Sequence, residues 1–351
     1  MASNRIGLTR EEVINTVYDG GGHIVILGAG ASIASTLRNQ EKSGKKLPAM
    51  SNLIKVIGLT DIVKKLPKIL QKKNFETLYS SIAEVKEFAD EVKEIEDRVQ
   101  AYFQSLELPD EPTIYDYLVL SLRPKDIIAT FNWDPFLFQA WSRHREFADL
   151  PYLAFLHGNV AIGFNEKAKV FGPVGMKASN SDEILTPTKL LFPVLKKNYQ
   201  DPYLTTQWDM FKDFLNDESV KRISVFGYAA PKSDFEAVNI LSESWFLNRK
   251  RDVEDIEIID ILPPERVEKH WSKFIPSSYY SIKDDFFKSI IAYNPRRTSE
   301  SFFHHSFSLN EDEAFAEPNP VPQDFKTLEE MRAWYKPLVD AENKKNEKNC
   351  R

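Results

Sequence analysis

The chain has 351 residues, of which 42% are hydrophobic and 28% charged, and its formal net charge is −6. This length can form one large domain or two ordinary ones with a sizeable core. The acidic balance argues against a general nucleic-acid or membrane-surface binder, and no apolar stretch approaches the roughly 20 residues that cross a bilayer. The basic runs KSGKK (42–46) and KKLPKILQKK (64–73) lack aromatic partners for stacking bases, so we interpret them as solvated surface.

The cysteine content limits the chemistry further. Cys350 is the only cysteine, which excludes an intrachain disulfide and a cysteine-based zinc site. The pair His304 and His305 has no further ligand at metal-binding spacing, so we predict no metal. The first residues, MASNRIGLTREE, lack the apolar core of a signal peptide, which favours a cytoplasmic protein.

The first element with a clear signature is GGHIVILGAGAS, residues 21–32. We expect a buried strand over 23–27 and then a tight turn that leads into a helix. Gly28 and Gly30 would let the backbone approach a phosphate at the start of that helix, although a purely structural turn explains them equally well. The dinucleotide fingerprint G-x-G-x-x-G is incomplete, because its sixth position is Ile33.

A helical insertion follows, at about residues 36–110. Between residues 75 and 103, apolar side chains recur every three or four positions and charged residues stand between them, which predicts one long amphipathic helix. Such a helix either packs on its own domain or serves a subunit interface.

Four further apolar segments, rich in β-branched and aromatic residues, predict strands at 126–131, 152–158, 222–228 and 256–261. Helix-compatible sequence separates them, and this alternation is typical of an α/β fold with a Rossmann-like parallel sheet covered on both faces. We predict one such domain over residues 1–300, interrupted by the helical insertion and by a loop-rich insertion at about 159–205. A polar C-terminal extension, 301–351, would contain a linker and a short helix with a frayed end.

Polar or small residues stand at the carboxyl ends of the later strands, where open α/β sheets bind their ligands. They are Thr130, Asn132 and Asp134; His157 and Gly158; Gly227, Tyr228 and Asp234; and Asp260. Structural alternatives exist, with Asn132 or Asp260 as a helix cap and His157 as a hydrogen-bonded core histidine. The order of the whole set along the chain favours a nucleotide-binding site at the carboxyl edge of the sheet. Arg296 and Arg297 could also reach a pyrophosphate, but we expect them to form a salt bridge with an acidic neighbour.

Taken together, Gly28-Ala29-Gly30-Ala31-Ser32, Thr130-x-Asn132-x-Asp134, His157-Gly158 and the Gly227 strand end resemble the sirtuin superfamily, in the family's order. The resemblance covers roughly residues 20–290. It implies that the glycine turn and Ser32 hold the phosphates of NAD, that Asn132 and Asp134 lie by the nicotinamide ribose and carboxamide, and that His157 reaches the ribose hydroxyls. Asp260 would lie near the adenosine.

The departures from that family narrow the expected activity. Sirtuin deacylases carry a four-cysteine zinc module after the histidine strand, and residues 159–205 contain no cysteine. The family's substrate loop is also unrecognisable after Ser32. Both departures argue against deacylation. In these two respects the chain resembles the bacterial sirtuin-like NADases of antiviral defence.

We therefore expect an NAD glycohydrolase, which uses NAD as its substrate and needs no zinc. Cleavage between nicotinamide and C1′ of ribose passes through an oxocarbenium-like transition state and requires an oriented ring, exclusion of bulk water and one placed water. Asn132 would hold that water or a ribose hydroxyl, His157 would move protons, and Asp134 would fix the carboxamide. The alternatives are ADP-ribosyl transfer or deacylation, and a non-catalytic NAD-sensing or assembly subunit.

The expected partners follow partly from the resemblance and partly from the chain itself. Defence NADases commonly work as oligomers or beside a second protein such as an ATPase or a sensor. The predicted 75–103 helix and the polar tail also suggest an assembly role. We therefore expect a homo-oligomer that binds neither nucleic acid nor membrane.

Overall fold

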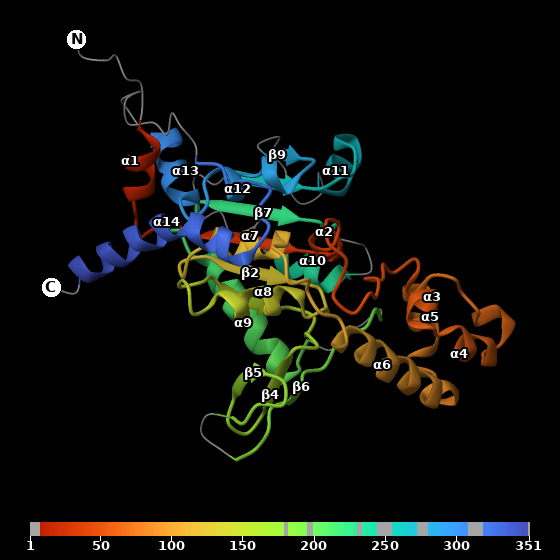
Figure 1. Ribbon diagram of the computed structural model, residues 1–351. Coiled ribbons are helices and arrows are strands. Elements are labelled where there is room, and N and C mark those ends of the chain that lie inside the picture. Colours follow the sequence, from red (N-terminus) through yellow and green to blue (C-terminus); the bar gives the residue numbers. More distant parts are fainter. Residues whose placement is uncertain are drawn as a thin grey trace, which may run out of the picture.

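The computed structural model describes residues 8–178, 182–194, 199–229, 234–243, 255–271, 280–307 and 319–349, so Cys350 lies outside the described residues. At its centre is a six-stranded sheet in the order β3-β2-β1-β7-β8-β9, in which every neighbouring pair is parallel. The strands are β1 (His23–Leu27), β2 (Ile127–Thr130), β3 (Tyr152–Phe155), β7 (Arg222–Phe226), β8 (Asp255–Ile259) and β9 (Tyr280–Lys283). This arrangement confirms the predicted Rossmann-like α/β fold (Figure 1).

Helices cover both faces of the sheet, because its central strands are apolar on both sides. All five residues of β1 are buried. On one face, Val25 and Leu27 belong to a core cluster with α7 (Ile114–Leu120), α8 (Phe136–His144), α12 (Ile290–Tyr293) and α14 (Leu328–Asn349). On the other face, Ile24 and Ile26 cluster with α9 (Pro202–Asn216), α10 (Phe235–Leu241) and α11 (Pro264–Trp271).

The sheet domain also holds α1 (Arg10–Asn15), α2 (Ala29–Ser35), α13 (Thr298–Phe307) and the 3-10 turn η5 (Phe286–Lys288). The 3-10 turn η1 (Lys68–Leu70) belongs to the helical insertion. Helix α2 begins directly after β1, as the glycine turn predicts. None of the described helices combines the length and the hydropathy that a bilayer span requires.

Two sheet elements were not anticipated from the sequence. The edge strand β9 has only half-buried side chains, so its sequence YSIK lacks the continuous apolar run that marks a central strand. The loop-rich insertion contains a small antiparallel sheet, ordered β5-β4-β6, of β4 (Ile162–Asn165), β5 (Val170–Pro173) and β6 (Thr186–Pro187).

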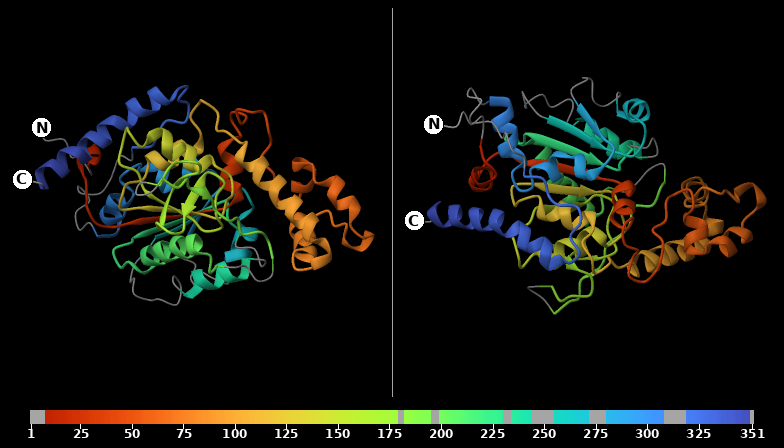
Figure 2. Two further views of the ribbon diagram at one scale, coloured as in Figure 1. Left: turned by 90° about the horizontal axis from the view of Figure 1, so that it is seen from below. Right: turned by 45° about the horizontal axis from the view of Figure 1, so that its top comes forward.

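The helical insertion projects to one side of the sheet, beyond the carboxyl ends of the strands (Figures 1 and 2). It holds α3 (Leu53–Ile57), α4 (Thr60–Lys65), α5 (Phe75–Ile82) and α6 (Ala89–Gln104). The prediction of one long helix over 75–103 is wrong, because α5 ends at Ile82 and the backbone is extended at Val85 before the 3-10 turn η2 (Lys86–Phe88).

The apolar stripes of α5 and α6 belong to one core cluster, which explains the break between them. Leu78 and Ile82 of α5 and Val99 of α6 are fully buried in that cluster. The Tyr79 hydroxyl also donates a hydrogen bond to Glu96, 17 positions further along the chain. The chain therefore doubles back, and a continuous 29-residue pattern becomes two helices that share one core cluster.

Helix α14 is longer than the short helix expected at the C-terminal end, with 22 residues, and it packs on the domain. Met331, Tyr335, Leu338 and Val339 are buried on its inner side. The carboxylate of Glu342 accepts hydrogen bonds of 2.6 Å from the guanidinium groups of Arg296 and Arg297, which precede α13. Both arginines therefore form the expected salt bridge, which lies at the amino edge of the sheet.

A chain of buried polar groups crosses β1, β7 and β8. His23 Nε2 lies 2.9 Å from Ser224 Oγ, and Ser224 Oγ lies 3.3 Å from Glu257 Oε1. Glu257 Oε2 accepts a hydrogen bond of 3.0 Å from the backbone N–H of Ile290. Burial raises the pKa of Glu257 to about 7, although this hydrogen bond and the nearby Lys283 and Arg222 partly oppose the rise. The folded protein therefore binds this proton more tightly than the unfolded chain does.

We predict that Glu257→Gln stabilises the protein at alkaline pH and has little effect at pH 4.5. Because the folded pKa is raised, the stability contributed by the protonated carboxyl is fully present below the unfolded pKa and is lost as the pH rises through about 7. The glutamine bears no charge, so its advantage should grow to roughly 1–3 kcal/mol above pH 8.

Urea unfolding of both proteins between pH 4.5 and 8.5 measures this difference. Glu265→Gln, on the exposed side of α11, is the matched control and should change nothing across that range. A pH-independent difference between Glu257→Gln and the unsubstituted protein would contradict the prediction.

Candidate active site

The carboxyl ends of β1, β2, β3 and β7 meet at one cavity of about 280 Å³. This is near the lower end of the roughly 300–1,000 Å³ found for small-molecule pockets. Eight of the residues singled out from the sequence line it, namely Gly28, Ala29, Asn132, Asp134, His157, Gly227, Tyr228 and Asp234. Most of the opposite wall comes from the helical insertion and the segment after β6, through Leu47, Pro48, Met50, Leu53, Glu76, Phe103, Leu191 and Pro193.

The glycine turn is packed directly against the turn that follows β7. Gly28 N donates to Phe226 O and Gly30 N donates to Gly227 O, both at 3.0 Å. A Cβ on Gly30 would lie 2.8 Å from Gly227 Cα, and one on Gly227 would lie 2.4 Å from Ala31 N at a φ of +62°. The two turns therefore approach more closely than side chains allow, and this contact explains the glycines.

The side-chain amide of Asn132 has a fixed orientation. Its Nδ2 lies 2.8 Å from both Gly28 O and Ser32 Oγ, and 3.3 Å from the Tyr115 hydroxyl. Gly28 O can only accept, so the group beside it is the amide N–H. No described residue donates a hydrogen bond to Asn132 Oδ1. The side chain therefore lines the cavity with its hydrogen-bond donors already used and its carbonyl oxygen available.

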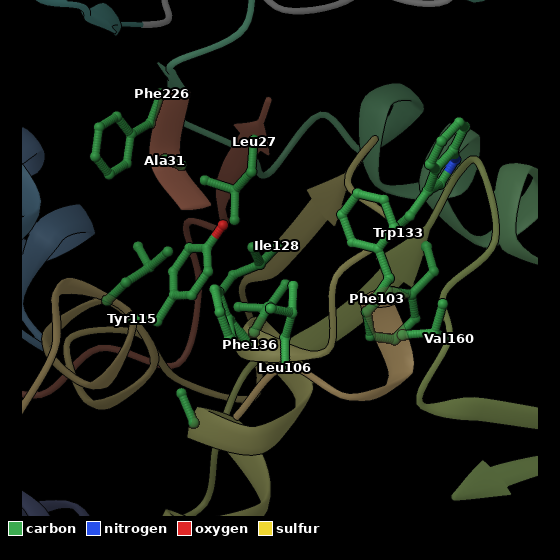
Figure 3. Packing of buried hydrophobic residues seen from close by; sticks show 14 of the residues in the cluster. Leu27, Ala31, Phe103, Leu106, Tyr115, Ile128, Trp133, Phe136, Val160 and Phe226 are labelled. Atoms are coloured by element: carbon green, nitrogen blue, oxygen red, sulfur yellow. The ribbon is translucent and has the colours of Figure 1, made fainter. Parts of the chain in front are cut away.

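Ser32 lies behind the cavity wall. Its side chain is fully buried, and its hydroxyl lies 2.6 Å from that of Tyr115. Figure 3 shows the Tyr115 ring with its hydroxyl directed at the turn between Leu27 and Ala31. The structure thus brings Ser32 into contact with Asn132 and does not bring it to the cavity surface.

Asp134 is a buried carboxylate surrounded by uncharged donors. Its Oδ1 accepts a hydrogen bond of 3.2 Å from Phe136 N, the first residue of α8, whose N-cap is Pro135, so neither Asp134 nor Asn132 is the helix cap. Burial raises its pKa to about 6, while hydrogen bonds from Ser32 and Phe136 limit the rise. Asn159 steadies the same turn by donating to Asp134 O at 2.7 Å. Asp134 therefore changes protonation state close to neutral pH.

His157 is held by an acidic and an aromatic environment. Its Nε2 lies 3.2 Å from Asp234 Oδ1 and 3.3 Å from the Tyr199 hydroxyl. The Tyr228 hydroxyl donates to the other oxygen of Asp234 at 3.1 Å. Phe131 stacks on Tyr228 at 4.3 Å between ring centroids and meets the imidazole edge-to-face at 4.8 Å. Tyr228, at the end of β7, and Asp234, at the start of α10, thus fix the histidine at the end of β3.

An aromatic cluster ties the helical insertion to the turn that carries Asn132. The indole of Trp133 lies 4.9 Å from the ring of Phe192 and 5.8 Å from that of Phe103, and Phe192 stacks on Tyr79 of α5 at 4.8 Å. Figure 3 shows Phe103 and Trp133 side by side. Packing of these rings fixes the insertion over the carboxyl ends of the strands.

Other predicted site residues lie beside the cavity without lining it. Thr130 Oγ1 accepts from Asn132 N at 3.0 Å, which orders the turn from within. Gly158 has a φ of +77°, and a Cβ there would lie 2.1 Å from Lys189 O. Asp260 Oδ1 accepts from Leu262 N at 2.9 Å, but α11 begins only at Pro264, so this bond orders a local turn and is not the helix cap considered for Asp260. The structure does not bring Asp260 to the cavity.

Four residues that shape the site were missed from the sequence. Tyr115, Asn159 and Tyr199 hold Asn132, Asp134 and His157, and Glu76 lines the opposite wall. None belongs to the strand-end motifs. Asn159 directly follows the His157-Gly158 pair, which is the only local signal that any of the four offers.

Neither metal ligands nor relatives help to define the site. Among the described residues, no group of three His, Cys, Asp or Glu side chains is arranged to hold a metal ion. A comparison with models of known protein families gives no match, and a comparison with curated proteins gives none either. Inference about function therefore rests on the geometry of the cavity and on the sequence motifs.

We predict that Tyr115→Phe destabilises the protein by about 1–2 kcal/mol, because it deletes a buried hydroxyl that Ser32 and Asn132 both contact. Tyr203→Phe is the matched control. Tyr203 is equally buried, but its hydroxyl has no hydrogen-bond partner in the part of the chain that the structure describes, so its removal should be neutral or slightly stabilising. Chemical unfolding at neutral pH compares the two, and equal losses of stability would contradict the assigned network.

Proposed function

We propose that this protein is an NAD glycohydrolase that releases nicotinamide and ADP-ribose, acting as an NAD-depleting effector of bacterial antiviral defence. The observation that carries the proposal is the pairing of Asn132 and His157, from neighbouring strand ends, on the wall of one cavity. The resemblance to sirtuin-like NADases adds the expected substrate. The missing cysteines support hydrolysis over zinc-dependent deacylation.

The size of the cavity fits the reacting half of NAD. About 280 Å³ suits a nicotinamide ring with its ribose better than a whole dinucleotide. In the proposed complex this half lies over Asn132 and His157, while the pyrophosphate and adenosine extend along the strand ends towards β8 and Asp260. Apolar walls from the helical insertion exclude bulk water from the reacting atoms.

Asn132 is proposed to place the water or a ribose hydroxyl. Its Nδ2 is occupied by Gly28 O and Ser32 Oγ, so the oxygen is the atom left for a ligand. A carbonyl oxygen accepts a hydrogen bond and cannot protonate a leaving group. That role suits this reaction, because nicotinamide leaves as a neutral molecule and needs no strong acid.

His157 is proposed to accept the proton that the water or hydroxyl loses as the new bond to C1′ forms. Asp234 lies 3.2 Å from the imidazole, and Tyr228 holds the other carboxylate oxygen, so Asp234 is a positioning residue in this scheme. An adjacent carboxylate orients an imidazole and stabilises its protonated form. Ionised Asp134 would accept a hydrogen bond from the nicotinamide carboxamide.

Assembly remains a proposal that rests on the resemblance to defence NADases, which implies a homo-oligomer and a second protein such as an ATPase or a sensor. The predicted long helix and the polar tail, which suggested assembly, both have another explanation in the structure. The 75–103 segment forms two helices whose apolar faces are buried in one core cluster, and α14 packs on the sheet domain. Both elements are accounted for within a single chain.

We expect the purified chain, or its assembled form, to release nicotinamide from NAD, and Asn132→Ala or His157→Ala to lower the rate by about 100-fold or more. Chromatographic separation of nicotinamide, ADP-ribose and protein-bound ADP-ribose measures this and separates hydrolysis from ADP-ribosyl transfer. Asn343→Ala, at the amino edge, is the control and should retain full activity. Nicotinamide release that both cavity variants retain would refute the proposed site.

The pH profile provides a separate prediction. Because the pKa of Asp134 is about 6, the ionised carboxylate that the mechanism uses forms above this pH. Nicotinamide release should therefore fall as the pH is lowered through about 6, mainly through a higher KM. In Asp134→Asn this inflection should disappear, with the KM raised at every pH. An unchanged inflection in that variant would assign the titration to another group.

A further inference from the structure

The two walls of the cavity differ in their ionisable groups. The strand-end wall contains Asp134, His157 and Asp234, whereas the opposite wall has a single ionisable residue, Glu76, in the first turn of α5. No lysine or arginine is among the described residues that line the cavity. The described charge around a bound ligand is therefore negative.

The three lining carboxylates are not equivalent. Asp134 accepts bonds from Phe136 N and Ser32, and Asp234 contacts His157 and Tyr228, so both are engaged by the protein. The carboxylate of Glu76 makes no hydrogen bond or ion pair with any described residue. It is half-buried among apolar lining residues, where an unpaired charge is attracted to a cation more strongly than it would be in open water.

The backbone at Glu76 is held in place, so its position does not depend on the ligand. Asn74 Oδ1 accepts from Thr77 N at 3.1 Å and caps α5 directly before it. Ser80 Oγ lies 2.8 Å from Glu76 O and 2.6 Å from Pro193 O, which joins the first turn of α5 to the neighbouring segment of the same wall. A carboxylate on a fixed backbone that has no partner among the described residues, and that lines a cavity, is a ready site for a positively charged group.

We infer that Glu76 contacts the positive charge of the substrate and selects the cationic, oxidised nicotinamide ring over the neutral reduced ring. This inference rests on the proposed function. When the C1′–N bond breaks, its electron pair moves to the ring nitrogen, which becomes neutral, and the positive charge passes to the ribose. Water then forms the new bond to C1′ and gives its proton to His157. Glu76 forms no covalent bond and stabilises the charge throughout.

Isothermal titration calorimetry with two probes tests the inference without turnover. Carbocyclic NAD keeps the cationic ring but cannot be hydrolysed, and NADH has the neutral ring. For Glu76→Gln we expect carbocyclic NAD to bind about fivefold to tenfold more weakly and NADH to bind within about twofold of its affinity for the unsubstituted protein. Glu84→Gln, on the exposed turn after α5, is the matched control and should leave both affinities unchanged.

A second variant keeps the test decisive if the glutamine alters the fold. Glu76→Asp retains the charge and should keep the preference for the cationic probe, and thermal melting of all variants checks their folding. Equal losses for both probes, or no loss for either, would overturn the role of Glu76. If the unsubstituted protein also releases nicotinamide, the proposed function stands without it, whereas failure of both probes to bind the unsubstituted protein would refute both.

Discussion

The candidate site depends on a backbone contact between two turns. The chain leaving β1 and the chain leaving β7 touch through Gly28, Gly30 and Gly227, with two N–H···O bonds of 3.0 Å that continue the pairing of the strands. At this distance there is no room for a side chain at any of the three positions. The contact fixes where α2 begins relative to the end of β7. It thereby fixes the positions of Ser32 and of the peptide oxygen of Gly28.

The polarity of the strand-end wall follows from that contact. Because Gly28 O faces β2, it accepts the amide N–H of Asn132, and the carbonyl of Asn132 is left to line the cavity. The turn after β7 has a second consequence, since it also carries Tyr228, whose hydroxyl donates to Asp234 beside His157. One close approach of two glycine turns therefore positions Asn132 directly and contributes to the position of His157 through Tyr228 and Asp234.

The sequence contains enough information for the sheet apart from β9 and for this wall, because each of the other strands is a local apolar run and most of the polar residues follow their strands directly. It does not contain enough for the opposite wall. Glu76 lies over the strand ends because the hydroxyl of Tyr79 in α5 bonds to Glu96 in α6 and because Trp133 packs on Phe192, and both contacts join separate segments of the sequence. Tyr115 was missed for a similar reason, since an aromatic residue early in a buried helix is indistinguishable from ordinary core packing. Asp260 lies at the carboxyl edge of the sheet, directly after β8. The cavity extends only as far as the end of β7, the strand between β1 and β8, so Asp260 does not line it.

Two buried carboxylates, one structural and one in the candidate site, have pKa values that are shifted in opposite directions. Asp116 and Asp134 are both almost completely buried, and burial alone would raise the pKa of each. For Asp116 the hydrogen bond from His144 and the charge of Arg143 outweigh this effect and lower the pKa to about 2, so it stays ionised and links α7 to α8. Asp134 receives only a hydroxyl and a backbone N–H, and its pKa stays near 6. A carboxylate left partly uncompensated retains a capacity for further hydrogen bonds, and it is the one that faces the cavity.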